Sequence, residues 1–270
     1  MSALKIKGLS LVRADGVTLV DNVDLALAPG ETLGIVGESG SGKSLTLRAI
    51  LGILPAGITA TGEITCTART AMVFQEPATA LNPTMRAGDL VARVWRRHHP
   101  GRSKADALTA AIELFEQVGI DRAADRLRAW PHELSGGMRQ RVMIAAALAA
   151  EPEVLLCDEP TTALDVRVQA QILDLLRDLI ARRSMAMIFV SHDLAVVASV
   201  SARLLVMRRG EVVETGVLTE VLAAPAHEYT AELLAANLGR RLRSESLGRR
   251  LRSESLGGRL RNENLGSVTR

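Results

Sequence analysis

The chain has 270 residues, of which 47% are hydrophobic and 2% aromatic, with a formal net charge of +3. A chain of this length supports one domain with a subdomain, packed mainly by Ala, Val and Leu. The longest apolar run near the middle, Val142–Ala150, has nine residues against the roughly 20 of a membrane span. Met1–Lys7 lacks a signal-peptide core, so we expect no insertion in the membrane by the chain itself. Cys66 and Cys157 are far apart, which fits a reducing cytosol and argues against a disulfide scaffold.

The first chemical motif is Gly37–Ser44, which fits the phosphate-loop pattern G-x-x-x-x-G-K-[ST] in full. The apolar run Glu31–Val36 before it predicts a buried strand, and Leu45–Leu51 after it has helical character. Glycines let the backbone approach phosphates, and a helix N-terminus adds partial positive charge. Lys43 is placed to reach the β- and γ-phosphates, and Ser44 to bind magnesium. The alternative is an ordinary glycine turn.

Gln75 follows a second short apolar run, Ala71–Phe74. Its side-chain amide is long enough to reach a magnesium ion or a water molecule beside the phosphates. From spacing alone, a structural role at the end of a strand is an equal alternative.

Residues 84 to 150 are mostly helical in pattern. The best helix candidates are Ala105–Gln117 and Gly137–Ala150, and Pro131 marks a break between them. The pair His98-His99 is interpreted as part of a solvated loop, because one adjacent pair lacks the multi-ligand spacing that zinc sites use.

The stretch His132–Arg141 contains Leu134, Ser135, Gly136 and Gly137. A serine hydroxyl, bare glycine backbone and a helix beginning near Met138 would make a second surface for an anion. The alternative is a helix N-cap made by Ser135. The two interpretations are compatible.

Two further apolar runs end in polar residues. Val154–Cys157 predicts a buried strand that ends in Asp158 and Glu159, and Met187–Ser191 is followed by His192. Ligands of open α/β sheets bind at such strand ends. Asp158 is suited to the magnesium shell, Glu159 to polarising or deprotonating water, and His192 to hydrogen bonding a γ-phosphate or water. A solvated strand end is the alternative for the acids, and a polar strand cap for the histidine.

Strands alternate with helices around residues 31 to 50 and again from 154 to 213, which predicts a parallel α/β core. The chain as a whole resembles the nucleotide-binding subunit of an ABC transporter over residues 1 to about 238. The matching motifs follow the family's order: the phosphate loop, Gln75, Leu134–Met138, Asp158-Glu159, Thr162–Asp165 and His192.

The resemblance implies an α/β fold with a P-loop ABC ATPase core and parallel sheet, a small antiparallel β subdomain and an inserted α-helical subdomain at about 84 to 150. The outer groove of that subdomain would accept a coupling helix from a permease, with Gln75–Thr84 as the hinge.

The resemblance also implies a head-to-tail dimer in which ATP and Mg2+ lie between one subunit's phosphate loop and the partner's signature, the segment Leu134–Met138. Asp165 would lie on the turn that communicates across this interface. The expected nucleotide-binding residues are Gly37, Glu38, Ser39, Gly40, Ser41, Gly42, Lys43, Ser44, Leu134, Ser135, Gly136, Gly137 and Asp165. The expected catalytic residues are Glu159, His192 and Gln75, and the expected magnesium ligands are Ser44, Gln75 and Asp158.

Finer features resemble the importers of dipeptides, oligopeptides, nickel and metal-chelating opines. These features are Phe74–Pro77, Leu81–Pro83, Pro160–Val166, Gln169–Leu173 and His227–Thr230, and Leu51–Ile58 resembles the first ATPase subunit of nickel importers.

The chain also departs from the family. It has no aromatic residue before Phe74 to stack on adenine, so Arg13 or Val17 is the expected substitute. The segment from Glu63 to Gln75 is short, which predicts a trimmed β region. No cysteine follows Cys157, so the iron–sulfur cluster of many peptide-importer subunits cannot form.

We therefore expect an ATP hydrolase that powers import through two separate transmembrane permease subunits. The other implied partners are a second, non-identical ATPase subunit and an extracytoplasmic substrate-binding protein, and the implied location is peripheral, at the cytoplasmic face of the plasma (inner) membrane. The alternative is a soluble ABC-type ATPase that acts on nucleic acid or ribosomes. The chain has neither the long coiled-coil insertion nor the second cassette usual in such proteins, so no direct nucleic-acid partner is expected.

The end of the chain has its own pattern. Leu238–Ser246 repeats identically at 247 to 255. Nine residues turn a helix through 900°, so successive repeats would face opposite sides, and we expect residues 239 to 270 to be disordered. They hold nine Arg and three Glu, so this tail carries +6 and the remainder −3 of the total +3. An inert tail and one that binds anionic lipid or nucleic acid are both open.

Overall fold

A six-stranded sheet forms the centre of the molecule in the computed structural model, which describes residues 2 to 237. Five strands are parallel, as the sequence predicts, and the edge strand β9 runs antiparallel to β8. This exception arises because Arg209 and Gly210, both with positive φ, make a tight turn between the two strands. In sheet order the strands are β5 (Thr70–Val73), β6 (Val154–Asp158), β7 (Ala186–Ser191), β3 (Thr32–Val36), β8 (Arg203–Arg208) and β9 (Glu211–Val217).

The central strands are buried on both faces, which explains their unbroken apolar sequences. Every residue of β6 and β7 is buried. Along β6, Leu155 and Cys157 belong to one hydrophobic cluster, and Val154 and Leu156 to another. Because side chains alternate between the faces of a strand, the sheet separates the two cores.

The second sheet is antiparallel and has three strands, in the order β2-β1-β4. This confirms the small antiparallel β subdomain, although no sequence pattern had placed its strands individually. The chain passes from β4 to β5 within a few residues, and the trimmed β region stays a prediction. The strands are β1 (Leu4–Arg13), β2 (Thr18–Leu27) and β4 (Ile58–Cys66).

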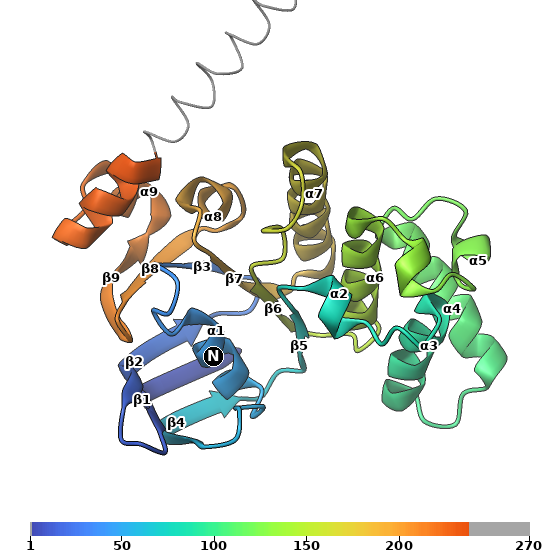
Figure 1. The fold of residues 1–270 in the computed structure, drawn as a ribbon, viewed down its shortest axis with the longest axis horizontal. Helices are drawn as coiled ribbons and strands as arrows, with labels where there is room; N and C mark the ends of the chain where they lie inside the picture. Colours follow the sequence, from blue (N-terminus) through green and yellow to red (C-terminus); the bar gives the residue numbers. More distant parts are fainter. Residues whose placement is uncertain (1, 238–270) are drawn as a thin grey trace, which may run out of the picture.

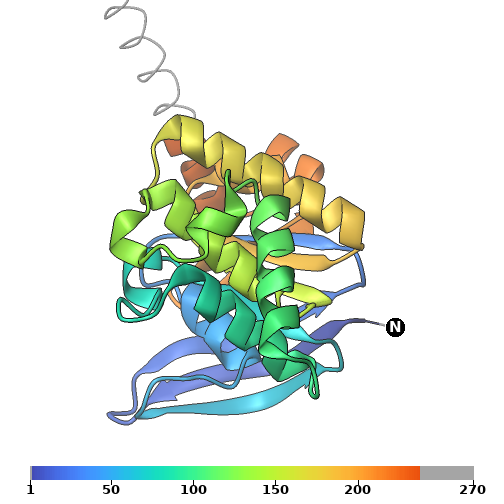
Figure 2. The same cartoon turned by 90° about the vertical axis from the view of Figure 1, so that its right-hand side faces the viewer.

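Between β5 and β6 the chain is helical. Helices α4 and α6 each begin one residue earlier than predicted, and Ser103 explains the start of α4, because its side chain and that of Asp106 form a capping box. Figures 1 and 2 show these helices gathered at the side of the molecule away from the antiparallel sheet. The helical elements are α2 (Pro77–Ala80), α3 (Ala87–His98), α4 (Lys104–Gln117), α5 (Ala123–Arg126), a 3-10 turn (Pro131–Glu133) and α6 (Gly136–Leu148).

Of the other helices, α7 and α8 connect strands of the large sheet, α1 leads from β3 to β4, and α9 follows β9. Figure 1 shows α7 and α8 above the sheet and α1 beside the antiparallel strands. A further helical segment runs from residue 228 to 237, where the described residues end, so the predicted tail at 239 to 270 lies outside them. The remaining helices are α1 (Lys43–Ile50), α7 (Val166–Arg183), α8 (Leu194–Val200) and α9 (Leu218–Ala223).

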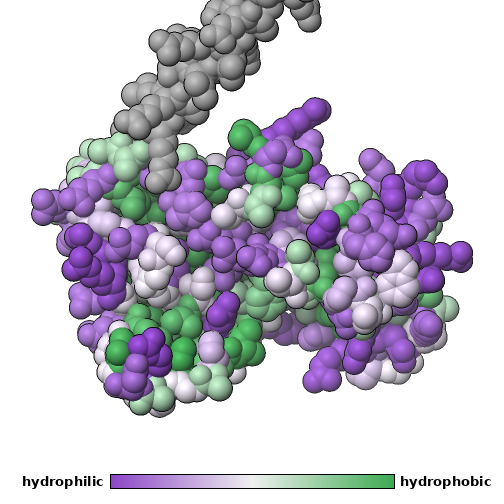
Figure 3. Space-filling model, in the orientation of Figure 1, coloured by the Kyte–Doolittle hydropathy of each residue, from purple (hydrophilic) through white to green (hydrophobic). Residues whose placement is uncertain are grey.

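The surface separates into regions of different polarity (Figure 3). Apolar residues gather over the antiparallel sheet and α1 at lower left, whereas the helical part at right is mostly hydrophilic. Within residues 2 to 237, none of the helices combines the length and the apolar character that crossing a bilayer would require.

Candidate nucleotide-binding site

The phosphate loop Gly37–Gly42 joins β3 to α1, as the strand, loop and helix order predicts. Gly40 and Gly42 have φ angles of 82° and 98°, which favour glycine. Gly37 lies against β8, where an added Cβ would stand 2.1 Å from the carbonyl oxygen of Met207. The loop therefore needs glycine both for its backbone conformation and for its close approach to the sheet.

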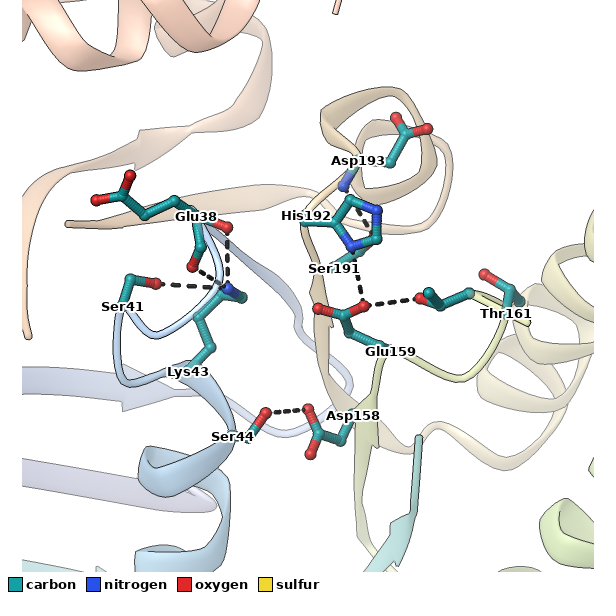
Figure 4. A network of polar contacts seen from close by, with 12 residues as sticks. Glu38, Ser41, Lys43, Ser44, Asp158, Glu159, Thr161, Ser191, His192 and Asp193 are labelled. Carbon is teal, nitrogen blue, oxygen red and sulfur yellow. Dashed lines mark hydrogen bonds and ion pairs between the residues drawn. The ribbon is translucent and has the colours of Figure 1, made fainter. Parts of the chain in front are cut away.

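Lys43 points back into this loop (Figure 4). Its Nζ donates to the carbonyl oxygens of Gly37 at 2.9 Å and Glu38 at 2.8 Å, and lies 3.4 Å from Ser41 Oγ. Burial lowers the pKa of Lys43, and the nearby Glu159, Asp158 and Glu38 carboxylates oppose that shift. The ammonium is thus hydrogen-bonded to the loop itself and lies near three carboxylates.

Asp158 ends strand β6 beside the loop. Ser44 Oγ, in the first turn of α1, donates to Asp158 Oδ1 at 2.7 Å. Asp158 is only 2% exposed, and burial raises the pKa of its carboxyl group, while the hydrogen bond from Ser44 opposes the shift. Two oxygen ligands suited to a hard cation are therefore adjacent.

Glu159 and His192 come together because β6 and β7 are neighbours in the parallel sheet. His192 Nδ1 lies 2.9 Å from Glu159 Oε2, and Thr162 Oγ1 donates to the same oxygen at 2.8 Å. Glu159 has a left-handed backbone, with φ of 44°, and its N–H donates to the Val190 carbonyl. Figure 4 shows Glu159 and His192 across the site from the phosphate loop. The hydrogen bond from Thr162 to Glu159 was not predicted, because a threonine three residues after an acid has no distinctive spacing.

Gln75 reaches the same region from the end of β5. It lines a cavity of about 510 Å3 together with Glu159, His192 and part of the phosphate loop. It also lines an adjoining cavity with Asp158 and Arg48. The structure therefore brings all the expected catalytic residues and magnesium ligands to the carboxyl ends of the strands.

The signature residues lie elsewhere. Ser135 caps α6 and accepts from the N–H of Met138 at 3.3 Å, as the capping interpretation predicts, and the helix begins at Gly136. Ser135 and Gly137 line a cavity that includes no phosphate-loop residue. Asp165 caps α7, accepting from the backbone N–H groups of Arg167 and Val168.

The signature and the start of α7 are in close contact. A Cβ on Gly136 would meet Leu164 Cδ2 at 3.7 Å, and one on Gly137 would meet Val168 Cγ1 at 2.7 Å. Leu134 is itself buried, at 3% exposure. The signature and the Asp165 turn therefore form one surface.

The two expected substitutes for an adenine-stacking aromatic lie at the β1–β2 turn. Arg13 is held by Asp15, with Nε 2.9 Å from Oδ1 and Nη2 2.7 Å from Oδ2, and Val17 is 45% exposed. The hairpin approaches the loop farther along β2, where a Cβ on Gly42 would meet Val20 Cγ2 at 2.8 Å. The role of either residue stays a prediction.

A phosphate loop that ends in Lys43 and Ser44, facing paired acids on the adjacent strand ends, defines a P-loop nucleoside-triphosphatase. The family model described as "ABC transporter" matches residues 20 to 162. The chain belongs to this family, and it is an ATP hydrolase of the transport type.

Named relatives are similar over most of the chain. The oligopeptide transport ATP-binding protein OppD of Bacillus subtilis is 46% identical over 239 residues, covering 82% of this chain and 66% of that protein. The dipeptide transport ATP-binding protein DppD of Lactococcus lactis is 42% identical over 252 residues, covering 86% and 72%.

A solved structure supports the fold. An ATP-binding cassette described as a dimer in a post-hydrolysis state, bound to ADP and Pi, matches with a TM-score of 0.70 and 28% identity. The match covers 80% of this chain and 98% of that one. The α/β ATPase fold expected from the sequence is therefore confirmed.

Proposed function

We propose that the residues at the ends of β3, β6 and β7 form the ATP-hydrolysis site. The observation that carries this proposal is the convergence of two polar pairs beside the phosphate loop, Ser44 with Asp158 at 2.7 Å and Glu159 with His192 at 2.9 Å. The residues fit ATP with Mg2+, because the glycine-rich backbone and an ammonium suit phosphates, and hydroxyl, amide and carboxylate oxygens suit magnesium. Gln75 would supply the amide oxygen.

In this proposal each residue has a separate task. Lys43 and the loop N–H groups hold the β- and γ-phosphates, and Ser44, Asp158 and Gln75 hold the metal, which neutralises phosphate charge when bound. Glu159 takes the proton from the attacking water. Its Oε2 already accepts from Thr162 and lies beside His192, so we assign Oε1 to the water. His192 would fix the carboxylate and could also hydrogen-bond the γ-phosphate.

The signature residues would serve the nucleotide of a second ATPase subunit. Ser135 and Gly137 line a cavity that contains no residue of this chain's own phosphate loop. This separation supports a role across an interface. Exposed Ser135 and Gly136 at the start of a 13-residue helix offer N–H groups to an anion. A similar cassette is described as a dimer, which supports the association of two such subunits. The domain boundaries at 1 to 238, with a helical subdomain at about 84 to 150, belong to this proposal.

The proposed cargo is peptide. The relatives are named for oligopeptide and dipeptide transport, and their similarity extends over 82% and 86% of this chain. Nickel and metal–opine complexes are further candidates from the sequence features alone. The proposed partners are two permease subunits, a second ATPase subunit and an extracytoplasmic binding protein, with this chain peripheral at the cytoplasmic face of the membrane. The named relatives are transport proteins, so they lend no support to action on nucleic acid.

Copurification from membranes tests the proposal. The chain is expected to copurify with its permease subunits, and its ATP hydrolysis to rise when a cognate binding protein carries a dipeptide or oligopeptide. Binding proteins loaded with nickel or an opine–metal complex are the matched comparison. If only the nickel-loaded binding protein stimulates ATP hydrolysis, nickel replaces peptide as the proposed cargo. Stimulation by nucleic acid without membrane partners would contradict the proposal that the chain powers an importer.

A further inference from the structure

Tyr229 contacts the phosphate loop from the far end of the chain. Its hydroxyl oxygen accepts a hydrogen bond from the backbone N–H of Glu38 at 2.9 Å, across 191 positions of sequence. The side chain is buried at 6% exposure. Glu38 follows Gly37, whose backbone packs closely against Met207 of β8. The start of the loop is therefore held from two sides.

A cation holds the Tyr229 ring in place. The guanidinium of Arg208, at the end of β8, lies 4.6 Å from the ring centroid, within the range of a cation–π interaction. The backbone N–H of Tyr229 donates to His227 Nδ1 at 3.1 Å. The ring is thus fixed relative to both the sheet and its own segment.

Glu214, on β9, anchors the segment that carries Tyr229. Its Oε1 accepts from the N–H of Ala226 at 2.8 Å and its Oε2 from the N–H of His227 at 3.1 Å. A carboxylate that accepts two backbone hydrogen bonds holds both donors in fixed positions. The helical segment 228–237 therefore begins at a defined point on the sheet.

The same segment also forms a wall of the catalytic cavity. Leu233, Ala236 and Asn237 line the cavity of about 510 Å3 that Gln75 and Glu159 also line. Tyr229 thus lies one to two helical turns before residues that face the reacting groups. Tyr229 and the residues that line the cavity therefore belong to one helical segment.

We propose that Tyr229 is a positioning residue for the phosphate loop, holding the N–H of Glu38 so that the loop is ready for nucleotide. The phenol does not touch the nucleotide in this proposal, and it acts only through the loop backbone. The inference rests on the proposed function of that loop in binding ATP. It gives His227–Thr230 a physical role, which its sequence pattern alone does not reveal.

Tyr229→Phe in the full chain tests the inference, because it removes the hydroxyl and keeps the ring over Arg208. A typical hydrogen bond contributes enough to change affinity by about 2- to 10-fold. We expect the Kd of a fluorescent ATP analogue to rise by that factor, and the Kd of ADP to rise as well, because the loop also holds the β-phosphate that both nucleotides share. The exposed neighbour supplies the control, since Glu228→Gln should leave both Kd values unchanged.

Three further measurements make the outcome decisive. Far-UV circular dichroism and Tm verify that each variant is folded at the temperature of the binding assay. If Tyr229→Phe does not fold, Glu214→Gln, which weakens the anchor and keeps the phenol, should raise the Kd instead. Lys43→Ala separates the proposed ATP site from the proposed role of Tyr229. If Lys43→Ala loses ATP binding and folded Tyr229→Phe binds ATP as tightly as wild type, only the role of Tyr229 is overturned. Undiminished binding in Lys43→Ala contradicts the ATP site itself.

Discussion

Ser44 donates a hydrogen bond to Asp158 over 2.7 Å although 114 residues separate them in the sequence. The contact exists because α1 begins at the end of β3 and Asp158 ends β6, in one parallel sheet. It brings a hydroxyl and a carboxylate together, and the two oxygens suit a bound cation. Without a cation, burial makes the negative charge of Asp158 unfavourable.

Asp158→Asn should therefore increase stability and abolish magnesium-dependent hydrolysis. The amide keeps an oxygen acceptor for Ser44 and removes a buried charge. We expect a gain on the order of 1 kcal/mol, or about 2–4 °C in Tm, without nucleotide. Differential scanning calorimetry without magnesium measures this gain, and a lower Tm for the variant would contradict it.

The pH dependence of stability should change with the same substitution. Burial raises the pKa of Asp158 in the folded protein, so the folded state binds the proton more tightly than the unfolded state. The contribution of Asp158 to the free energy of unfolding is fully present below the pKa that Asp158 has in the unfolded state. It is lost as pH rises through the pKa that Asp158 has in the folded state. The difference in unfolding free energy between wild type and Asp158→Asn should thus grow with pH across that window. A pH-independent difference would contradict the raised pKa.

Glu159→Gln should lower kcat by about 10²- to 10⁴-fold, the usual contribution of a general base, while ATP still binds. The closed, ATP-loaded assembly is expected to accumulate, which size-exclusion chromatography with ATP would detect. Turnover at the wild-type rate would exclude Glu159 as the base.

His192→Ala should lower kcat because the imidazole lies 2.9 Å from Glu159 Oε2. If His192 acts through that carboxylate, the double variant with Glu159→Gln should hydrolyse ATP no more slowly than Glu159→Gln alone. Thr162→Val, which removes the other hydrogen bond to the same oxygen, is the matched comparison. Fully multiplicative losses would mean that the histidine acts independently.

Gly37→Ala should lower Tm and weaken ATP binding, because the new Cβ would stand 2.1 Å from the backbone oxygen of Met207. Gly136→Ala is the contrasting variant, since its Cβ would make an ordinary 3.7 Å contact with Leu164. We expect its Tm to be unchanged or higher, as alanine favours helix. Its turnover in the assembled transporter should fall if the signature serves a partner's nucleotide. Thermal unfolding and ATPase assays would distinguish these outcomes, and a wild-type Tm for Gly37→Ala would be inconsistent with the close packing.

The sequence by itself determined the family, the fold class and the segments that hold the chemistry. It could do so because a phosphate loop requires glycines, Lys43 and Ser44 at fixed local spacing, and because a buried parallel strand such as Val154–Asp158 reads as one apolar run ending at its polar edge. These are properties of contiguous residues. The antiparallel strands lacked such a signature, so their positions had to come from the structure.

Only the tertiary structure decided which distant groups meet. Strand order makes β6 and β7 neighbours and so joins Glu159 to His192, and packing of the last described segment on β9 brings the Tyr229 hydroxyl to the N–H of Glu38. The direction of the Asp158 pKa shift likewise depends on burial by surrounding elements. Strand order, side-chain contact and desolvation are set by residues far apart in the chain, so the spacing of neighbouring residues does not predict them.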